Sequence, residues 1–350
     1  MSRPTMSAAI AELERIGYVD EIGVVQGTMG RRAVKYRAGR GAGHIIAVDA
    51  GATHVRLRLA TLDRRLLHSR VHRLPTRQLM LNEEISAAVA DEVAAAIAER
   101  QDEWGPLRVV GIALPTRVVD KGLDWDATRQ NVIFSRFSPP GGVDLVLENN
   151  VNCAAVAERF YGAAKDWPTF AYIQIGLKIG MGLMLGGELV RGRNGAAGEI
   201  GHLSFPFAPG LLPVAGEAER YMGTEALIAR VRADWPADAG APPLDTRELL
   251  SRAEAGEPAA LVHVDRHATD VGALIAACVS VVDPGLVVLG GGMGASPLLL
   301  PKTREVANRL SYPVEVENSA LGSDATVLGI ERLAIDRAMS FLLGDDPITP

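Results

Sequence analysis

The sequence contains few cysteines and lacks the long apolar run of a membrane protein. Only two of its 350 residues are cysteine, which excludes a disulfide framework. We expect Cys153 and Cys278 to be small core residues in a reducing compartment. The most apolar stretch, 271–292, is interrupted by Asp283 and Pro284, so no segment should cross a bilayer. A secretory signal pattern is also missing at the N-terminus. These absences predict a cytoplasmic protein without a membrane partner.

The composition is that of an ordinary globular protein, with 48% hydrophobic and 22% charged residues. A chain of 350 residues suits two or three packed units. Residues 1–44 hold seven basic and four acidic side chains, a net charge of +3, whereas the whole chain carries −6. A basic N-terminal segment followed by an acidic remainder suits the binding of a polyanion. A net charge of +3 over this segment is equally compatible with an ordinary uneven distribution of charged residues.

Residues 1–37 read as a helix followed by a hairpin. Ser2 can cap the helix, which should end at Gly17. Strand-like runs at 19–25 and 33–36 flank a glycine-containing turn with two arginines. Helix, hairpin and basic tip together resemble the back half of a winged helix-turn-helix, and we call this segment the head.

A linker and an α/β unit follow the head. Residues 38–43 alternate glycine with alanine and arginine, which predicts a flexible linker. Strands at 45–48 and 55–60 should flank a turn at 49–53. Further expected elements are a helix over 83–100 capped by Asn82, and strands over 109–114, 145–147 and 286–289.

The strand–turn–strand pattern occurs a second time, at 170–185. One such repeat predicts an α/β protein with two lobes of the actin-like (RNase H-like) kind and a ligand cleft between them. The predicted boundaries are a small lobe over 44–147, a large lobe over 148–324, and a C-terminal helix over about 325–343 that packs back onto the small lobe.

Four segments together resemble the ROK family of repressors, open reading frames and sugar kinases. They are 48–53 with Arg56, 148–155, 195–202, and 283–284 with the glycines at 290–292. Their order and spacing carry the resemblance, which covers nearly the whole chain. It implies the ROK fold and places the chain in the branch of transcriptional regulators with a degenerate sugar-kinase site.

In kinases of the family, glycine turns approach the phosphates of ATP through backbone N–H groups. The second turn is usually Gly-Thr-Gly, but here it reads Gly176-Leu177-Lys178 and has lost a hydroxyl and a glycine. The alternative is that Lys178 pairs with phosphate. The degenerate nucleotide residues implied by the resemblance are Asp49, Gly51, Thr53, Gly176, Lys178 and Gly291.

Asn150 stands where kinases of the family carry an aspartate that acts as general base. A carboxylate accepts a proton, whereas an amide does not at neutral pH. General-base catalysis contributes about 10²–10⁴-fold to a rate. The substitution therefore predicts that kinase activity is lost, so we expect no catalytic residue and no cofactor. Asn149 and Asn150 can still bind a sugar hydroxyl or cap the helix that follows.

The resemblance also implies a sugar site. Glu199 and His202 match family residues that bind sugar hydroxyls, and Glu219 and Asn131 are further candidates. In zinc-containing members this histidine joins three cysteines, whose positions here fall on Gly210, Leu212 and Glu217. One histidine is not enough for structural zinc, so we predict no metal.

The head resembles the recognition helix and wing of ROK repressors. Short polar and arginine side chains suit base edges, and a wing arginine suits phosphate or the minor groove. Family repressors carry two further helices before this one, so the head is expected to be partial. The candidate DNA-binding residues are Ser2, Arg3, Thr5, Ser7, Arg31 and Arg32.

The sequence therefore predicts a sugar-responsive regulator, most simply a repressor, that binds operator DNA and a sugar effector. We expect a homodimer or a dimer of dimers, because helix-turn-helix proteins read two half-sites. An ATP-dependent kinase for a hexose or N-acetylhexosamine and a DNA-free sugar-binding protein are the alternatives.

Overall fold

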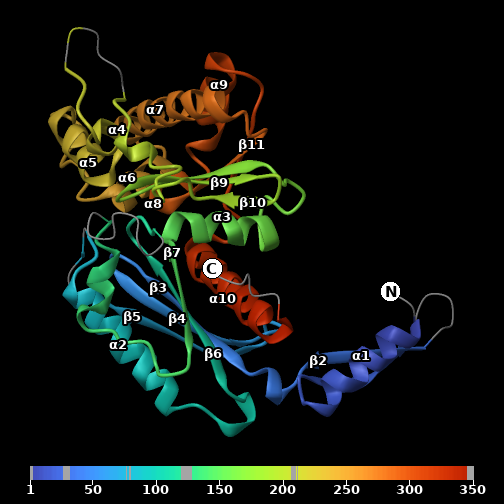
Figure 1. Ribbon diagram of the computed structural model, residues 1–350. Helices are drawn as coiled ribbons and strands as arrows, with labels where there is room; N and C mark the ends of the chain where they lie inside the picture. Colours follow the sequence, from blue (N-terminus) through green and yellow to red (C-terminus); the bar gives the residue numbers. More distant parts are fainter. Residues whose placement is uncertain are drawn as a thin grey trace. The chain divides into compact units, whose positions relative to one another are not determined.

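The computed structural model describes residues 3–26, 32–75, 77–78, 80–119, 128–205, 210 and 212–344. The chain divides into two compact units (Figure 1). Unit 1 comprises residues 1–150 and 330–350, and unit 2 comprises residues 151–329. The boundary expected from the sequence, between 147 and 148, lies three residues before this division.

The sheet of unit 1 has five strands in the order β5-β4-β3-β6-β7. The strands β3, β4 and β5 are antiparallel neighbours, whereas β6 and β7 continue the sheet in parallel to β3. The expected strands are present, and β5 is an addition that the sequence analysis did not predict. The strands are β3 (His44–Ala50), β4 (His54–Thr61), β5 (Leu66–Arg73), β6 (Leu107–Leu114) and β7 (Asp144–Asn149).

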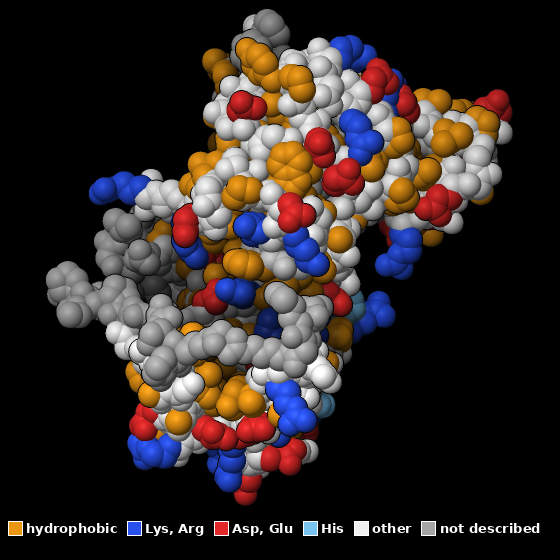
Figure 2. Space-filling model, turned by 90° about the vertical axis from the view of Figure 1, so that its right-hand side faces the viewer, with side chains coloured by type: hydrophobic (Ala, Val, Ile, Leu, Met, Phe, Trp, Pro, Cys, Tyr) orange, Lys and Arg blue, Asp and Glu red, His pale blue; other side chains and the backbone are white. Residues whose placement is uncertain are grey.

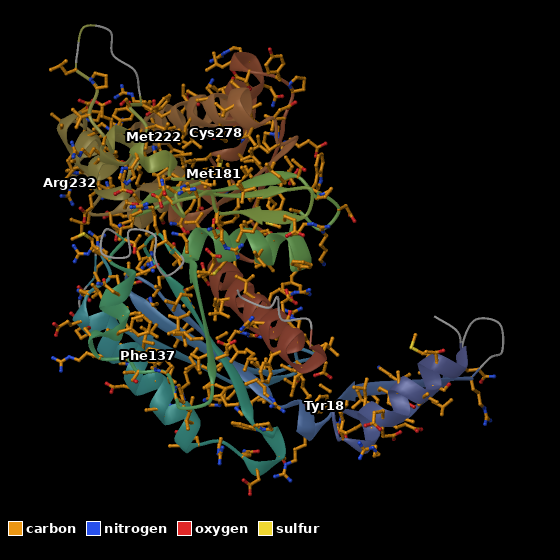
Figure 3. The ribbon with its side chains drawn as sticks, in the orientation of Figure 1. Tyr18, Phe137, Met181, Met222, Arg232 and Cys278 are labelled. Carbon is orange, nitrogen blue, oxygen red and sulfur yellow. The ribbon has the colours of Figure 1, made fainter. Side chains whose placement is uncertain are left out.

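Helices cover both faces of this sheet (Figure 1). Helix α2 (Glu83–Ala98) begins as predicted, because the side chain of Asn82 accepts a hydrogen bond from the Ile85 N–H at 3.0 Å. Its apolar side chains share a core with β3, β4 and β6, in which Phe137 is also buried (Figure 3). On the other face, Gly111 of β6 lets α10 (Ala325–Leu343) approach, since a Cβ there would lie 3.0 Å from Ile330.

Unit 2 repeats the same strand order, β10-β9-β8-β11-β12, with the same pattern of antiparallel and parallel pairs. The repeat inferred from two hairpins thus extends to whole five-stranded sheets. Its strands are β8 (Phe170–Ile175), β9 (Ile179–Leu185), β10 (Glu188–Val190), β11 (Leu286–Gly290) and β12 (Glu315–Asn318).

The core of unit 2 lies between its sheet and the long helix α7 (Pro258–Val282), and Met181, Met222 and Cys278 belong to it (Figure 3). On the opposite face α3 (Asn150–Tyr161) packs directly on β9, where a Cβ at Gly182 would lie 2.7 Å from the Cβ of Ala155. The remaining helices are α4 (Glu217–Met222), α5 (Thr224–Ala233), α6 (Thr246–Glu254), α8 (Gly291–Gly294) and α9 (Leu300–Leu310).

The head consists of α1 (Arg3–Arg15) and the antiparallel hairpin β1 (Val19–Gln26) and β2 (Arg32–Ala38). Ser2, expected as the helix cap, and most of the predicted turn, 27–31, lie outside the described residues. Within the described part of the head, Ile10 and Leu13 are half-buried, whereas Ile16 is exposed.

The segment 38–43, where we expected a flexible linker, is instead hydrogen-bonded both to the head and to β6. It contains the 3-10 helix η1 (Arg40–Ala42), and the Gly41 N–H donates to the Gly17 carbonyl at 2.7 Å. The Arg108 guanidinium of β6 donates to the carbonyls of Gly41 and Ala42 at 2.7 and 3.1 Å. A glycine-rich composition here reflects close backbone packing, since a Cβ at Gly41 would lie 2.7 Å from the Ile16 carbonyl oxygen.

None of the described helices is long and apolar enough to cross a membrane. On the face drawn in Figure 2, the coloured basic and acidic side chains are interspersed. The side chains drawn in colour on that face therefore form no extended field of one sign.

Candidate functional site

The first glycine turn of unit 1 contains a buried carboxylate. Asp49 lies at the end of β3, and its nearest charged partner is Arg56 of β4, with Nη1 3.5 Å from Oδ2. Burial raises the pKa of Asp49 to about 6, although Arg56 acts in the opposite direction. Asp49 is therefore a group that changes charge near neutral pH.

The turn itself is narrow. The Gly51 N–H donates to the His54 carbonyl at 3.1 Å, and a Cβ at Gly51 would lie only 2.8 Å from that same oxygen. The Thr53 hydroxyl lies 2.9 Å from Nδ1 of His54. The position requires glycine, as expected, while the threonine hydroxyl already has a partner within the turn.

The glycine turns of unit 2 lie side by side. A Cβ at Gly176 would be 3.5 Å from the backbone nitrogen of Gly292, and Gly291 has a positive φ of 82°. The Gly176 carbonyl accepts the N–H of Thr224 at the start of α5, at 2.9 Å. Lys178 is half-buried in the same turn. The sequence-predicted residues Gly176, Lys178 and Gly291 thus belong to one corner of unit 2.

The predicted asparagines of unit 1 lie at the end of β7, at the start of α3 and in η4 (Gln130–Ser135). Asn149 ends β7 and donates from Nδ2 to the Thr116 carbonyl at 3.1 Å, and α3 begins at Asn150. Asn131 is half-buried within η4. The neighbouring Gln130 was missed by the sequence analysis. It is fully buried and holds both backbone groups of Val119, at 2.8 and 2.9 Å.

Glu199 and His202 lie together in unit 2, at and within the short 3-10 helix η5 (Ile200–His202). Gly198, with φ of 83°, folds the chain against β9, where the Met181 N–H donates to the Gly198 carbonyl at 2.8 Å. The Nε2 atom of His202 lies 4.0 Å from Oε2 of Glu199, and their side chains are 71% and 31% exposed. Both groups are accessible to a ligand.

Glu219 reaches the same place from α4. Its Oε2 atom would lie 3.3 Å from a Cβ at Gly201, so the carboxylate rests against the backbone of η5. The Leu203 carbonyl also accepts the N–H of Ala218, at 3.0 Å. Glu219 therefore lies against the same short helix, η5, that contains His202 and follows Glu199, and we call these three residues the Glu–His–Glu cluster.

Helix α4 contacts a group of partly buried polar residues that the sequence analysis missed. The Arg230 guanidinium stacks on the Tyr221 ring at 3.9 Å, donates to the Tyr221 carbonyl at 3.0 Å, and pairs with Asp270 at 3.6 Å. Beside them His267 is fully buried, and burial lowers its pKa to about 3, so it is uncharged. These residues are spread over α4, α5 and α7, and no sequence motif links them.

Among the described residues, no group of three or more histidines, cysteines or acids is arranged to hold a metal ion. Residues 206–209 and 211, in the loop where zinc-containing relatives carry cysteines, lie outside the described part. Gly210, Leu212 and Glu217, at the cysteine positions, offer no thiol.

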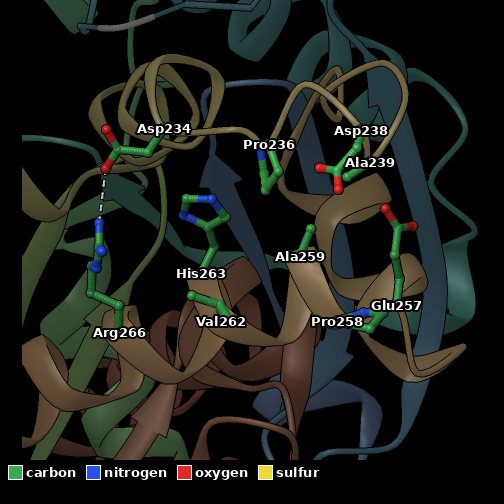
Figure 4. A pocket seen from close by; sticks show the side chains of 10 residues that line it. All are labelled: Asp234, Pro236, Asp238, Ala239, Glu257, Pro258, Ala259, Val262, His263 and Arg266. Atoms are coloured by element: carbon green, nitrogen blue, oxygen red, sulfur yellow. Dashed lines mark hydrogen bonds and ion pairs between the residues drawn. The ribbon is translucent and has the colours of Figure 1, made fainter.

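A pocket of about 910 Å³ opens elsewhere on unit 2, between the end of α5 and the first half of α7 (Figure 4). Its rim carries Asp234, Asp238 and Glu257, and Arg266 is already paired with Asp234 at 2.8 Å. None of the residues predicted from the sequence lines this pocket.

The candidate DNA-binding residues are only partly described. Thr5 and Ser7 of α1 and Arg32 at the start of β2 are exposed. Ser2, Arg31 and the side chain of Arg3 lie outside the described residues.

Comparison with known proteins gives relatives along the whole chain. The xylose repressor of Bacillus subtilis (strain 168) is 23% identical over 98% of this chain and 90% of its own length. The solved structure of a ROK family transcriptional regulator, a homologue of the Escherichia coli MLC protein, has a TM-score of 0.74 at 18% identity, covering 98% of this chain and 91% of that one.

Kinases are also among the relatives. The ROK family glucokinase of Streptomyces griseus, solved with glucose and AMPPNP, has a TM-score of 0.63 at 25% identity, covering 84% of this chain and all of the other. The model of the ROK family matches residues 45–337, which is most of the chain. The protein is therefore a member of the ROK family, with the two-sheet α/β fold that its solved neighbours share.

Proposed function

We propose that this protein is a sugar-responsive transcriptional regulator that acts as a repressor and transfers no phosphate. The observation that carries the proposal is Asn150, an amide at the position of the kinase general base, in a chain whose relatives over nearly its full length include xylose repressors. An amide binds a hydroxyl but takes up no proton at neutral pH.

The effector is proposed to be a monosaccharide bound through its hydroxyls. In unit 2 the Glu–His–Glu cluster offers two carboxylates as acceptors, and a neutral imidazole offers one donor and one acceptor. Within unit 1 the amides of Asn149, Asn150 and Asn131 are proposed as further groups that bind hydroxyls. A hydrogen-bond donor or acceptor in a fixed position distinguishes hydroxyl positions on a ring by the direction of its hydrogen bond.

The head is proposed to bind operator DNA through α1 and the tip of the hairpin. Its hydrogen bonds to unit 1 through η1 support a mechanism in which the head moves with the body of that unit. Sugar binding would then shift the population between two arrangements of the protein, of which one binds the operator more tightly. A dimer would read two half-sites.

Calorimetric titration with D-xylose, D-glucose and N-acetyl-D-mannosamine tests the sugar site. At least one sugar should bind to wild type, and Glu199→Gln should weaken it by about tenfold or more, because a charged acceptor is lost. The exposed Glu317→Gln, on β12, serves as the matched control and should bind as wild type does. No binding of any of these sugars would contradict the proposed effector class.

The kinase alternative is tested with the same sugars in a coupled assay of ADP release. Glucokinases are among the relatives, and they are the reason for testing kinase activity. We expect turnover far below about 1 s⁻¹, the lower end for ordinary enzymes. Turnover at or above that rate would make the protein a sugar kinase.

The DNA-free alternative is tested by selecting binders from a pool of random 30-base-pair duplexes (about three helical turns). Enrichment of a two-fold symmetric sequence, released by the bound sugar, is the expected result. Sugar binding without any enriched sequence would instead favour a DNA-free sugar-binding protein.

A further inference from the structure

Glu219 belongs to α4, a helix of only six residues. So short a helix is not stable by itself, and its position therefore depends on contacts with its surroundings. In its first turn the N–H of Ala218 donates to the carbonyl of Leu203, the residue after η5, at 3.0 Å. Just past its end the N–H of Thr224 donates to the Gly176 carbonyl at 2.9 Å. These backbone bonds hold the two ends of α4, and a further contact comes from a side chain of the next helix.

That contact is made by Arg230 of α5. Its guanidinium donates to the carbonyl of Tyr221, in the last turn of α4, at 3.0 Å, and its Cζ atom lies 3.9 Å from the centre of the Tyr221 ring. The last carbonyls of a helix have no partner within the helix. Arg230 therefore satisfies one of these carbonyls and packs on the side chain of the same residue, only two positions after Glu219.

Asp270 of α7 keeps Arg230 in this place. Its Oδ2 atom lies 3.6 Å from Nη1 of Arg230, and the two side chains are only 20% and 27% exposed, so salt screens this pair less than a surface pair. His267, one turn earlier on α7, is fully buried and uncharged. It therefore adds no charge that would compete with Arg230. Through Arg230 and Asp270, α4 is connected to α7, which packs on the sheet of unit 2.

We propose that Arg230 is a positioning residue for the sugar site, which holds α4 so that the Glu219 carboxylate stays against η5 and thereby raises the affinity for the sugar. This inference rests on the proposed function, because Glu219 is one of the proposed acceptors of sugar hydroxyls. A binding group has to be held within about 0.5 Å of its productive position by the residues that support it. Arg230 acts in this way through α4 and needs no contact with the ligand.

Helix α5 also offers a matched control. Arg232, two residues after Arg230, likewise donates to backbone carbonyls, those of Leu244 at 2.7 Å and Pro243 at 3.5 Å (Figure 3). These carbonyls lie in the segment between α5 and α6, which contains no member of the Glu–His–Glu cluster. Loss of Arg232 therefore removes the same kind of hydrogen bond from unit 2, but not one that is made to α4.

Calorimetric titration with D-xylose, D-glucose and N-acetyl-D-mannosamine compares these variants. A sugar that binds to wild type should bind to Arg230→Leu about fivefold more weakly or worse, and to Arg232→Leu as it does to wild type. Arg230→Lys keeps a cation beside Asp270 and should fall between wild type and Arg230→Leu; it also serves as the test variant where Arg230→Leu does not fold. Equal affinity in wild type and both Arg230 variants, or equal weakening in Arg230→Leu and Arg232→Leu, would overturn the proposal.

A double-mutant cycle shows whether the effect passes through Glu219. In a Glu219→Ala background, Arg230→Leu should weaken the sugar by less than about twofold further, because the carboxylate that Arg230 positions is absent. The same fivefold weakening in both backgrounds would mean that Arg230 acts independently of Glu219, and would contradict the positioning role.

Amide hydrogen exchange at Ala218 tests the same positioning without any sugar. The N–H of Ala218 joins α4 to the residue after η5, so its exchange should be faster in Arg230→Leu than in wild type and in Arg232→Leu. Unchanged exchange at Ala218 would overturn the inference even if the sugar affinity fell. If wild type binds none of the three sugars, the proposed effector class fails, whereas the exchange measurement still decides whether Arg230 positions α4.

Discussion

At the scale of single residues, the proposed function depends on the contrast between Asp49 and Asn150. Asp49 is a carboxylate buried beside Arg56 in the first glycine turn, whereas Asn150, which we propose to stand at the position of a general base, is an amide. A protein selected only to bind can keep a buried acid because it shapes the turn, but has no need for a proton acceptor.

The buried Asp49 gives a testable dependence of stability on pH. Its folded-state pKa, about 6, is above the ordinary value of 3.8, so folding favours the protonated form. This contribution to stability is present below the ordinary pKa and is lost as the pH rises through about 6. Asp49→Asn should therefore raise the free energy of unfolding at pH 7.5 by up to about 3 kcal/mol, and by much less at pH 4.

Urea unfolding of Asp49→Asn and wild type between pH 4 and pH 8 measures this difference. The exposed Asp265→Asn on α7 is the matched control and should show a difference close to zero throughout. A constant difference across the whole range would mean that Asp49 does not titrate in the folded protein as described.

At the scale of elements, the sequence predicted most strands and the hairpin repeat, because buried strands are continuous apolar runs such as 45–48 and 170–173. It did not predict β5, because this edge strand has little burial and mixes His68, Arg70 and other polar side chains with its apolar ones, so that it shows no apolar run. The sequence also did not predict the hydrogen bonds that hold the segment 38–43, because they come from Arg108, which is far away in the chain.

The sequence likewise predicted only part of the candidate site. Glu199 and His202 stand in one motif, and Glu219 joins them in the structure. The residues that support them could not be found from the sequence, because Arg230 and Asp270 lie on different helices and contact α4 only after folding. Motifs reveal residues that share a local segment, whereas supporting contacts depend on the tertiary packing.

This support predicts that α4 depends on Arg230. Arg230→Leu removes a stacked cation, a hydrogen bond to α4 and the partner of the half-buried Asp270. The free energy of unfolding should fall by about 2–3 kcal/mol, and amide hydrogen exchange across 217–222 should speed up more than across α9. Arg309→Leu, which breaks only an exposed pair, should cost about 0.5 kcal/mol or less. Unchanged exchange in α4 would rule out the anchoring role.

At the scale of the whole molecule, unit 1 is completed only by the last helix of the chain. Glu331 of α10 is fully buried and pairs with Arg58 at 2.7 Å and Arg64 at 3.3 Å, both from the β4 hairpin. The hairpin near residue 60 thus gains this partner from a residue that lies 273 positions after Arg58 and 267 after Arg64 in the sequence. Contacts so distant in sequence slow the search for the native fold.

Removing this carboxylate should be costly, because it leaves two arginines without their buried partner. We expect Glu331→Ala to lower the free energy of unfolding by about 3 kcal/mol in urea titrations followed by circular dichroism. Glu317→Ala, which breaks an exposed pair with Arg304 at 3.5 Å, should change it by about 0.5 kcal/mol or less. If both substitutions lowered the free energy of unfolding equally, Glu331 would contribute no more to stability than an exposed acid does.

The bonded junction between head and lobe restricts how this protein can be recombined with its relatives. A chimaera cut after residue 42 or 43 would take the carbonyls of Gly41 and Ala42 from one parent and the Arg108 guanidinium to which they are bonded from the other. Exchanging heads between members of this family therefore calls for a crossover before residue 38, which keeps the segment 38–43 together with Arg108, or for transplanting Arg108 along with the new head.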